Sequence, residues 1–583
     1  MFLRYKYNFL IILSTILLLL ISFIIGIYYS SHQIVSSQMS TYFFEALSIV
    51  LTEYKYGFDG YQGKLEIFNF LKHFSSKIDH INKAIDYVLK NDFTNNNSYH
   101  LLHVSEIGYV DFIRHSFFLF GFKLSSIYFL FYLILLVSII LFIFSEYNNP
   151  LHLLLLLLVV FSISLVLISF VSTDSFKDLL SEYNIDRAIK ITTVNNVRAL
   201  SILGIIPSLG LLIYLTTNEK FNIIKFIIFI LQLLLVLYLI RCRTHLIWFV
   251  IPPTIYLIYL FLKKIYFLYI KKNKIHTNIY FFTLNYLIIL FLLISTFSLD
   301  KQIKNKNYFE SYNLYNHSPA FSFVIGILIE NKFREKYTGY KRIPEKDFFE
   351  EHRCKFNPDS EFCNIANISF LRPLAQKLHK MNIEIHNYDV DGYSAAFKWL
   401  ERNNRSYYEL FSFDEEDNIN FVDYFYPFIF KKDKIKTKSN NLKEFEFTKH
   451  FKFYKVEEIN RYVIKDMFIN EPFSLIKISL IYKPLLYLKN VAFNFILLND
   501  FRIVMISMFF LIILFLIFIN RYINFDLKLR SQNTILIVSF LIGSLSQNVY
   551  GSIHSQVIHD SNVCFLFFIL YCIQIFILKI RKV

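Results

Sequence analysis

"SSIYFLFYLILLVSIILFIFSEYNNPLHLLLLLLVVFSISLVLISFV", residues 125–171, decides the fold. It contains two apolar runs, 125–145 and 151–171, separated by a polar turn that ends in proline. Each run is close to the roughly 20 residues that a helix needs to cross a bilayer. Only a helix satisfies every backbone hydrogen bond within a single membrane-crossing segment. The stretch therefore predicts two antiparallel helices that cross a membrane.

Similar runs recur along the chain, which has 583 residues of which 55% are hydrophobic. They lie near 9–28, 199–216, 223–240, 246–262, 279–298, 503–520, 534–553 and 563–579. Together with the first two, they predict an all-α polytopic membrane protein with about ten transmembrane helices. The first run has no small-residue cleavage site after it, so we expect a retained anchor rather than a signal peptide.

The basic residues predict the orientation, because Lys and Arg are enriched in short cytoplasmic loops. The dense basic clusters nearly all fall on the side of the N-terminus, namely Lys263, Lys264, Lys271, Lys272 and Lys274, then Arg521, Lys528 and Arg530, then Lys579, Arg581 and Lys582. Arg241 and Arg243 fall on the other side and break the pattern. We expect both termini in the cytoplasm and the protein in a membrane, most simply a bacterial inner membrane. The net charge of +16 is explained by these loops, so lipid is the expected partner and nucleic acid is not.

The pattern divides the chain into five parts. Residues 1–28 form the anchor span, and 29–124 form an outer loop with surface-lying amphipathic helices, indicated by the apolar spacing over 67–90. Residues 125–298 form a six-span bundle, 299–490 an outer soluble domain of α/β or α+β type, and 491–583 a three-span segment. Helix-like and strand-like stretches alternate within 299–490, which is the basis for that class.

The cysteines indicate redox context rather than metal binding. Cys354 and Cys363 lie in the predicted outer domain and could form a disulfide in an oxidising compartment. The chain has no CxxC or Cys/His spacing typical of zinc, so no metal ligands are assigned. A divalent metal ion in the chemistry considered below stays open.

Charge is scarce inside the spans and concentrated at their outer ends. The scarcity argues against an ion-coupled transporter, which needs ionisable groups along its path. The outer ends supply the candidate site: Glu106 and Asp111 as catalytic acids, with Arg114, His115, Arg241, Arg243, His245, His554, His559 and Asp560 as binding residues. Arginine suits bidentate phosphate binding, and a nearby carboxylate suits a general base acting on a sugar hydroxyl. The simpler alternative is that these groups anchor the chain at the water boundary.

The layout resembles the GT-C class of membrane glycosyltransferases, over most of the chain. Members have a first span, a long outer loop with a catalytic acid, further spans and often an outer domain. That resemblance implies a polyprenyl-phosphate-linked sugar donor. The chain departs from the class after the first span, where "YYSSHQIVSSQMSTYFFEAL" (28–47) lacks the usual acidic motif. The catalytic acid would then come from one of five residues: Glu45, Glu53, Asp59, Glu106 or Asp111.

Two other functions fit the same layout. An envelope polysaccharide polymerase or ligase would use Arg241, Arg243 and His245 on a lipid pyrophosphate. A non-catalytic membrane protein would bind a partner through its outer domain. A cleft at the outer leaflet lined by Glu106 or Asp111 with an arginine favours the transferase, whereas a cleft centred on Arg241 and Arg243 favours the polymerase or ligase. The absence of a cleft, with these side chains in water, favours the binding protein.

Overall fold

The structure is a computed structural model that describes part of the chain. It covers residues 2–30, 41–57, 61–73, 78–93, 99–101, 107–169, 197–217, 222–269, 279–307, 468–469, 472–477, 480–481, 483–490, 502–522, 527–550 and 559–580. Within these ranges the chain is nearly all helical, with a single two-stranded sheet. Most of the predicted α/β domain, including Cys354 and Cys363, lies outside the described residues.

Nine helices in the described part are long and apolar enough to cross a membrane. Seven are single helices: α1 (Phe2–Ser30), α6 (Leu124–Glu146), α7 (Pro150–Ser169), α10 (Ile223–Cys242), α12 (Ile279–Asn307), α24 (Arg502–Tyr522) and α26 (His559–Ile580). Two begin with a 3₁₀ turn: η1 (Val197–Gly204) with α9 (Ile205–Thr217), and η2 (Thr244–Val250) with α11 (Ile251–Tyr269). The predicted class of polytopic helical membrane protein is confirmed.

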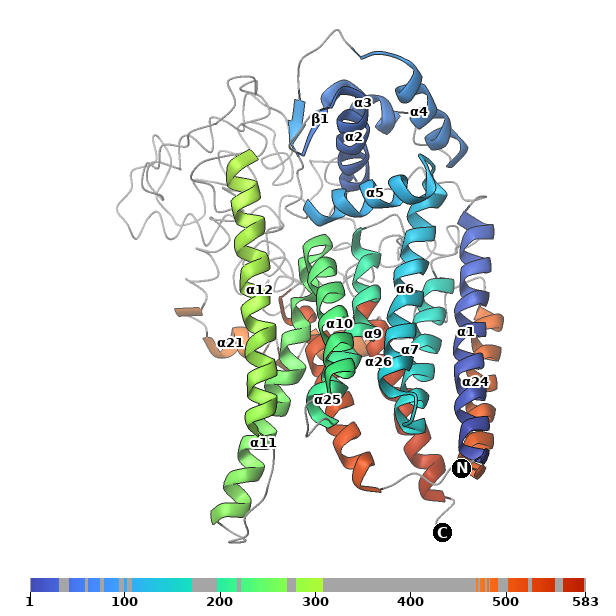
Figure 1. Ribbon diagram of the computed structural model, residues 1–583, viewed down its shortest axis with the longest axis vertical. Coiled ribbons are helices and arrows are strands. Elements are labelled where there is room, and N and C mark those ends of the chain that lie inside the picture. The colour runs from blue at the N-terminus through green and yellow to red at the C-terminus, as the bar shows by residue number, and fades with distance from the viewer. Residues whose placement is uncertain are drawn as a thin grey trace, which may run out of the picture.

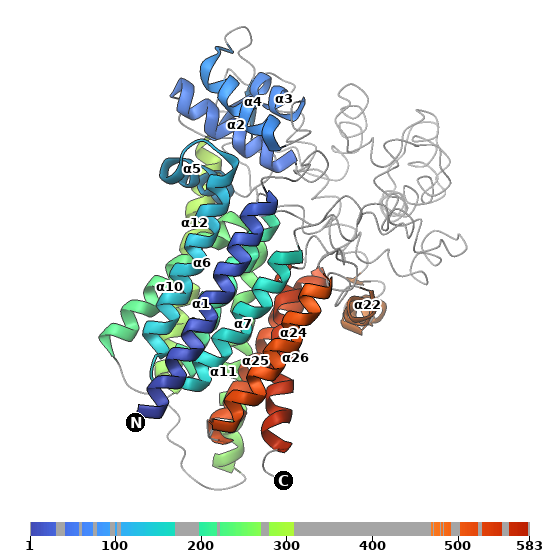
Figure 2. The ribbon, with the colours of Figure 1, turned by 90° about the vertical axis from the view of Figure 1, so that its right-hand side faces the viewer.

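The tenth predicted span corresponds to α25 (Leu527–Tyr550), whose apolar part is shorter and covers Asn533–Ser546. α25 packs along α11 and α26 as a member of the bundle (Figure 2). Polar residues at both of its ends, such as Arg530 and Gln547, shorten its apolar segment. Length and composition alone therefore support nine spans.

α7 lies at the centre of the bundle, and the whole of its apolar segment is buried inside the protein. α1 and α26 both pack against it. The N- and C-termini lie at the same end of the bundle (Figure 1). α1 is mostly exposed, with 28% of its apolar segment buried, so it forms part of the outer wall.

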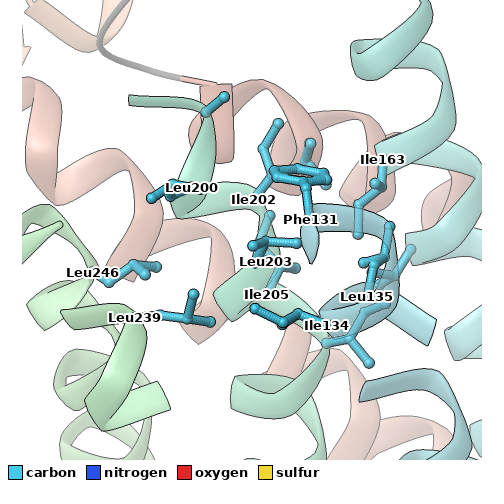
Figure 3. Packing of buried hydrophobic residues seen from close by; sticks show 14 of the residues in the cluster. Phe131, Ile134, Leu135, Ile163, Leu200, Ile202, Leu203, Ile205, Leu239 and Leu246 are labelled. Atoms are coloured by element: carbon cyan, nitrogen blue, oxygen red, sulfur yellow. The ribbon is translucent and has the colours of Figure 1, made fainter. Parts of the chain in front are cut away.

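The core of the bundle is built from large aliphatic and aromatic side chains of α6, α7, η1, α9 and α10. Figure 3 shows Phe131 and Leu135 of α6 beside Leu203 of η1 and Ile205 of α9, all buried. Branched apolar side chains at this density leave little room for water, so the described core is held by packing.

The turn between α6 and α7 begins the second helix of the hairpin predicted from 125–171. Asn149 caps α7, since its Oδ1 accepts the backbone N–H of Leu151 at 3.2 Å, and Pro150 occupies the first helical position. The turn also contains a buried polar contact, with His152 Nδ1 2.6 Å from Glu146 Oε2. The Lys225 amine of α10 lies 3.7 Å from Glu146 Oε1.

A small head subdomain, which we define as residues 41–120, lies beyond the other end of the bundle (Figures 1 and 2). It consists of α2 (Thr41–Tyr56), β1 (Gln62–Lys64), α3 (Leu65–His73), α4 (Ile78–Lys90), β2 (Tyr99–Leu101) and α5 (Ile107–Phe120). β1 and β2 pair antiparallel, with Gln62 opposite Leu101. The helical spacing over 67–90 is confirmed as two helices, α3 and α4.

α5 runs across the end of the bundle rather than along it (Figure 1). It touches α10 at Gly108, where a Cβ would lie 2.6 Å from both the carbonyl carbon of Arg241 and the backbone nitrogen of Cys242. Glycine is therefore required for this close approach. Gly121, with φ of +85°, lets the chain turn from α5 into α6.

Candidate functional site

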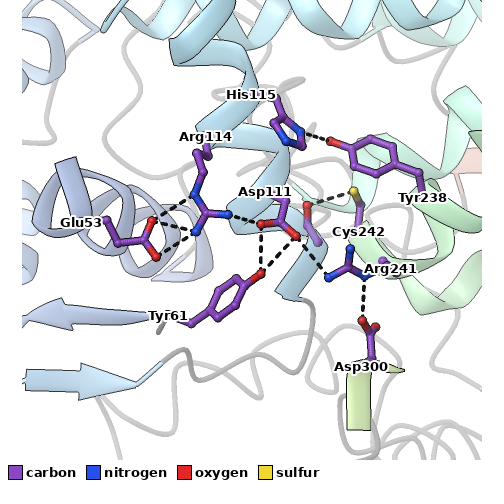
Figure 4. A network of polar contacts seen from close by, with 10 residues as sticks. Glu53, Tyr61, Asp111, Arg114, His115, Tyr238, Arg241, Cys242 and Asp300 are labelled. Carbon is purple, nitrogen blue, oxygen red and sulfur yellow. Dashed lines mark hydrogen bonds and ion pairs between the residues drawn. The ribbon is translucent and has the colours of Figure 1, made fainter. Parts of the chain in front are cut away.

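Five charged side chains form a continuous ion-pair chain that joins the head subdomain to the bundle (Figure 4). In order of contact they are Glu53 of α2, Arg114 and Asp111 of α5, Arg241 of α10 and Asp300 of α12. Four elements from distant parts of the sequence thus meet at one polar centre, which we call the ion-pair chain.

Arg114 links α2 to α5. Its Nη2 donates to Glu53 Oε1 at 2.8 Å and Oε2 at 2.7 Å, and its Nε donates to Oε2 at 3.0 Å. Its other terminal nitrogen, Nη1, pairs with Asp111 one turn away on the same helix. A guanidinium has donors on several sides in one plane, which is why arginine can hold two carboxylates at once.

Arg241 links α5 to α12 in the same manner. Its Nη2 lies 3.2 Å from Asp111 Oδ2, and its Nε donates to Asp300 Oδ1 at 2.7 Å. The close approach of Gly108 to α10 sets this geometry, because Asp111 is one helical turn beyond Gly108. The Cys242 thiol donates to the Gly108 carbonyl at 3.0 Å and fixes the same crossing.

Tyr61 completes the group around Asp111. Its hydroxyl donates to Asp111 Oδ1 at 3.1 Å and lies 3.3 Å from Oδ2, while the Arg114 guanidinium lies 5.3 Å from its ring centroid. Tyr61 has φ of +50°, an unfavourable conformation for an aromatic residue. Backbone strain of this kind occurs often at functional sites.

The ion-pair chain is largely shielded from water and has excess negative charge. The exposed fractions of the Asp111 and Asp300 side chains are both 9%, against 36% for Arg114. Three carboxylates face two guanidinium groups, so the chain has a formal charge of −1 when all are ionised.

The titration behaviour of the head-subdomain members follows from burial and charge. Burial raises the pKa of Glu53 above its usual value, although the Arg114 guanidinium opposes the shift. Burial, and then the negative charge of Asp111, raise the pKa of Tyr61, so its hydroxyl stays protonated at neutral pH. Burial alone would lower the pKa of Arg114, but Glu53 and Asp111 more than offset it, and Arg114 stays cationic.

Of two further predicted binding residues, His115 lies beside this centre (Figure 4). His115 is exposed, and its Nδ1 is 3.2 Å from the Tyr238 hydroxyl, on the side of α5 that faces away from Glu53 (Figure 4). Arg243 is the C-cap of α10 and is buried, with 2% of its surface exposed.

Asp560 is fully buried at the start of α26, where Trp248 Nε1 donates to its Oδ2 at 2.7 Å. Nearby on the same helix, Asn562 accepts a hydrogen bond of 2.8 Å from the buried Tyr487 of α22 (Lys483–Asn490). Asp560 is thus held by the indole of η2 within a second polar group, formed by α22, α26 and η2.

The remaining predicted site residues are outside what the structure describes. Glu106 and His554 lie in undescribed segments, and the side chains of His245 and His559 are not described although their helices are. Their roles stay predictions.

Two members of this centre were missed at the sequence level as site residues. Asp300 follows the predicted span 279–298 and was assigned to the outer domain, but it continues α12. Tyr61 is one of 41 tyrosines, and only the fold distinguishes it. One signal in the sequence points to Asp300: it is the first acid after the predicted span 279–298. That span is predicted to end on the same side of the membrane as the span before Arg241.

The described residues contain no group of three or more His, Cys, Asp or Glu side chains that could hold a metal ion. The described carboxylates of the ion-pair chain are engaged by arginine instead. No protein-family model, curated protein or solved structure shows significant similarity to the chain.

Proposed function

We propose that this integral membrane protein is a GT-C-type glycosyltransferase that uses a polyprenyl-phosphate-linked sugar at the head-subdomain face of the membrane. The observation that carries the proposal is the position of Asp111, buried between Arg114 and Arg241 where α5 crosses the bundle. A carboxylate and two arginines at a membrane boundary match the needs of sugar transfer from a lipid phosphate.

The arrangement of elements supports the same class. An anchor span is followed by a head subdomain with a crosswise helix, and then by the rest of the bundle (Figure 2). The usual acidic motif after the first span is missing, so the acid must come from later in the chain. Of the five candidates, Glu53 and Asp111 belong to the ion-pair chain.

In the proposed reaction the bond between the sugar anomeric carbon and the donor phosphate oxygen breaks, and a bond to the acceptor hydroxyl oxygen forms. The hydroxyl proton passes to a carboxylate, and the polyprenyl phosphate leaves with one more negative charge. Arg241 or Arg114 stabilises that charge. Asp111 or Glu106 is the proposed base, and Glu53, whose raised pKa favours proton uptake, is a third choice.

An envelope polysaccharide polymerase or ligase is the second candidate, because Arg241 stands between Asp111 and Asp300. In that reading Arg241, with Arg243 and His245, binds a lipid pyrophosphate. Turnover of a pyrophosphate-linked donor would favour the polymerase or ligase, and turnover of a monophosphate-linked donor would favour the transferase.

The proposal includes a location and an outer domain. We place the protein in a bacterial inner membrane with both termini in the cytoplasm and the head subdomain outside. Residues 299–490 then form an outer α/β or α+β domain in which Cys354 and Cys363 form a disulfide. A partner-binding role of this domain is the non-catalytic alternative.

The experiment uses the full chain in lipid nanodiscs with a panel of radiolabelled polyprenyl monophosphate and pyrophosphate sugars. Release of the lipid phosphate is measured for wild type and for Asp111→Asn, which we expect to lower the rate by about a hundredfold or more. Asp92→Asn is the matched control, because Asp92 is an exposed carboxylate of the head subdomain, with 73% of its side chain accessible.

Thermal unfolding of each variant separates lost chemistry from lost folding. Full activity of an Asp111→Asn, Glu106→Gln double variant would remove both favoured bases. If wild type turns over no donor in the panel while a soluble partner binds its outer domain, the non-catalytic alternative replaces the transferase.

A further inference from the structure

The end of α5 that leads into α6 presents three consecutive apolar side chains to the exterior. The exposed fractions are 86% for Phe118, 54% for Leu119 and 39% for Phe120. If these two phenylalanines and this leucine were in water, the protein would lose about 25 cal/mol of hydrophobic stabilisation for each Å² of their apolar surface left unburied. A cover for this end of α5 is therefore expected.

This apolar end continues a row of side chains on α6. The Phe120 ring lies against the Phe129 ring, with centroids 5.6 Å apart. Phe129 begins a row that recurs every three or four residues along the exposed side of α6: Phe129, Leu133, Val137, Ile140 and Phe144, exposed by 38%, 40%, 38%, 41% and 73%. Since α6 is a candidate membrane span, this row faces lipid acyl chains.

The contact with Phe129 also indicates how far the Phe120 ring lies along the membrane span α6. Phe129 is five residues beyond the first residue of α6, which is roughly 7 Å along the helix axis. The Phe120 ring therefore reaches below the start of the apolar span, into the edge of the hydrocarbon layer.

We propose that Phe118, Leu119 and Phe120 are inserted among the acyl chains of the leaflet on the head-subdomain side. α5 lies crosswise to the spans in both views (Figures 1 and 2), so its whole length is at a similar depth. Asp111 is seven residues from Phe118, roughly 10 Å along this helix. The insertion thus holds the ion-pair chain close to the boundary between the acyl chains and the lipid headgroups.

The lipid contact follows from the exposed side chains and the span alone. One consequence rests on the proposed function: a lipid-phosphate donor would reach Arg114 and Arg241 sideways from the leaflet, without leaving the membrane. A water-soluble donor with a short prenyl chain would not depend on this route.

The test is the quenching of tryptophan fluorescence in vesicles made with brominated phosphatidylcholine. Phe118→Trp is compared with Tyr87→Trp, which places a new tryptophan at an exposed position of α4, 49% accessible. The parent spectrum, with its two tryptophans, is subtracted. Bromine near the headgroup should remove about half or more of the added emission of Phe118→Trp and little of that of Tyr87→Trp. Leu119→Trp is the second variant if Phe118→Trp does not fold.

Emission that is unquenched and red-shifted would place the α5 end in water, and emission that is unquenched but blue-shifted would place it under protein, such as a second copy. Either result overturns the insertion. Quenching without turnover of any donor supports the insertion and counts only against the proposed function. If turnover occurs, Phe118→Asp should raise the KM for a long-chain donor severalfold and leave that for a short-chain donor unchanged.

Discussion

Asp111 accepts contacts from three donors, Arg114, Arg241 and Tyr61, and so determines how α5 is held. Its three partners satisfy a carboxylate that would otherwise be costly to bury. Glu53 enters the proposed mechanism beside Asp111 because burial raises the pKa of Glu53, which favours proton uptake.

The bridging role of Arg241 predicts the effect of Arg241→Lys. A lysine keeps the charge but cannot present two fixed donors to Asp111 and Asp300. We expect a loss of about 1–3 kcal/mol in the free energy of unfolding, measured by thermal unfolding in nanodiscs. Lys90→Arg, the same pair of residue types at an exposed position of α4, should have no effect. Equal stability of Arg241→Lys and wild type would mean that charge alone suffices.

The raised pKa of Glu53 predicts a pH dependence of stability. Because the folded state binds this proton more tightly than the unfolded chain, the stabilisation is present at low pH and is lost as pH rises through the raised pKa. Glu53→Gln does not titrate. The Tm of wild type should therefore fall relative to that of Glu53→Gln as the pH is raised from about 4 to about 7. A shift in the opposite direction would show that Arg114 outweighs burial.

Among the elements, the crossing of α5 over α10 is the most sensitive to a single methyl group. Gly108→Ala places a Cβ 2.6 Å from the α10 backbone, so α5 must move away. The movement would lengthen the contact between Asp111 and Arg241 and remove the Cys242 hydrogen bond. We expect weaker protection of the head subdomain from proteolysis, with the bundle intact. Lys123→Ala, at an exposed position just after α5, is the control.

The turn between α6 and α7 predicts a strong coupling between Glu146 and His152, whose side chains are 5% and 1% exposed. Removing His152 takes the closest partner from the buried Glu146 carboxylate, which keeps only Ser145 and Lys225, and costs about 1–3 kcal/mol. Replacing both residues with apolar ones costs less. His152→Leu should therefore destabilise the protein more than the double variant with Glu146→Leu. Additive effects in this cycle would show that the pair is not coupled. Asp86→Asn, at an exposed carboxylate, is the control.

For the molecule as a whole, the head subdomain and the termini lie at opposite ends of the bundle (Figure 1). With the orientation predicted from the basic loops, a cysteine at Lys83, exposed on α4, should react with an impermeant maleimide in intact cells. A C-terminal tag should become accessible to antibody only after permeabilisation. The parent chain measures background labelling, and the reverse pattern would invert the orientation.

Much of this architecture could be predicted from the sequence because lipid imposes long apolar runs, as in 125–171. The short apolar part of α25 shows where that signal weakens. At the site, Asp111, Arg114 and Arg241 were candidates because they fall near the ends of apolar runs. Their pairing, and the presence of Tyr61 and Asp300, depend on how α5 crosses α10 and α12, which no local pattern encodes.

The burial of α7 has a consequence for biosynthesis. A helix enclosed by protein on all sides has no lasting need to be soluble in lipid, and polar side chains with partners would serve it as well. Yet α7 carries an almost unbroken series of leucine, isoleucine and valine. This segment leaves the translocon ahead of η1, α9 and α26, so it must partition into the bilayer before these later helices can cover it. The apolar sequence of α7 therefore suits the lipid into which it inserts, and η1, α9 and α26 later take the place of that lipid.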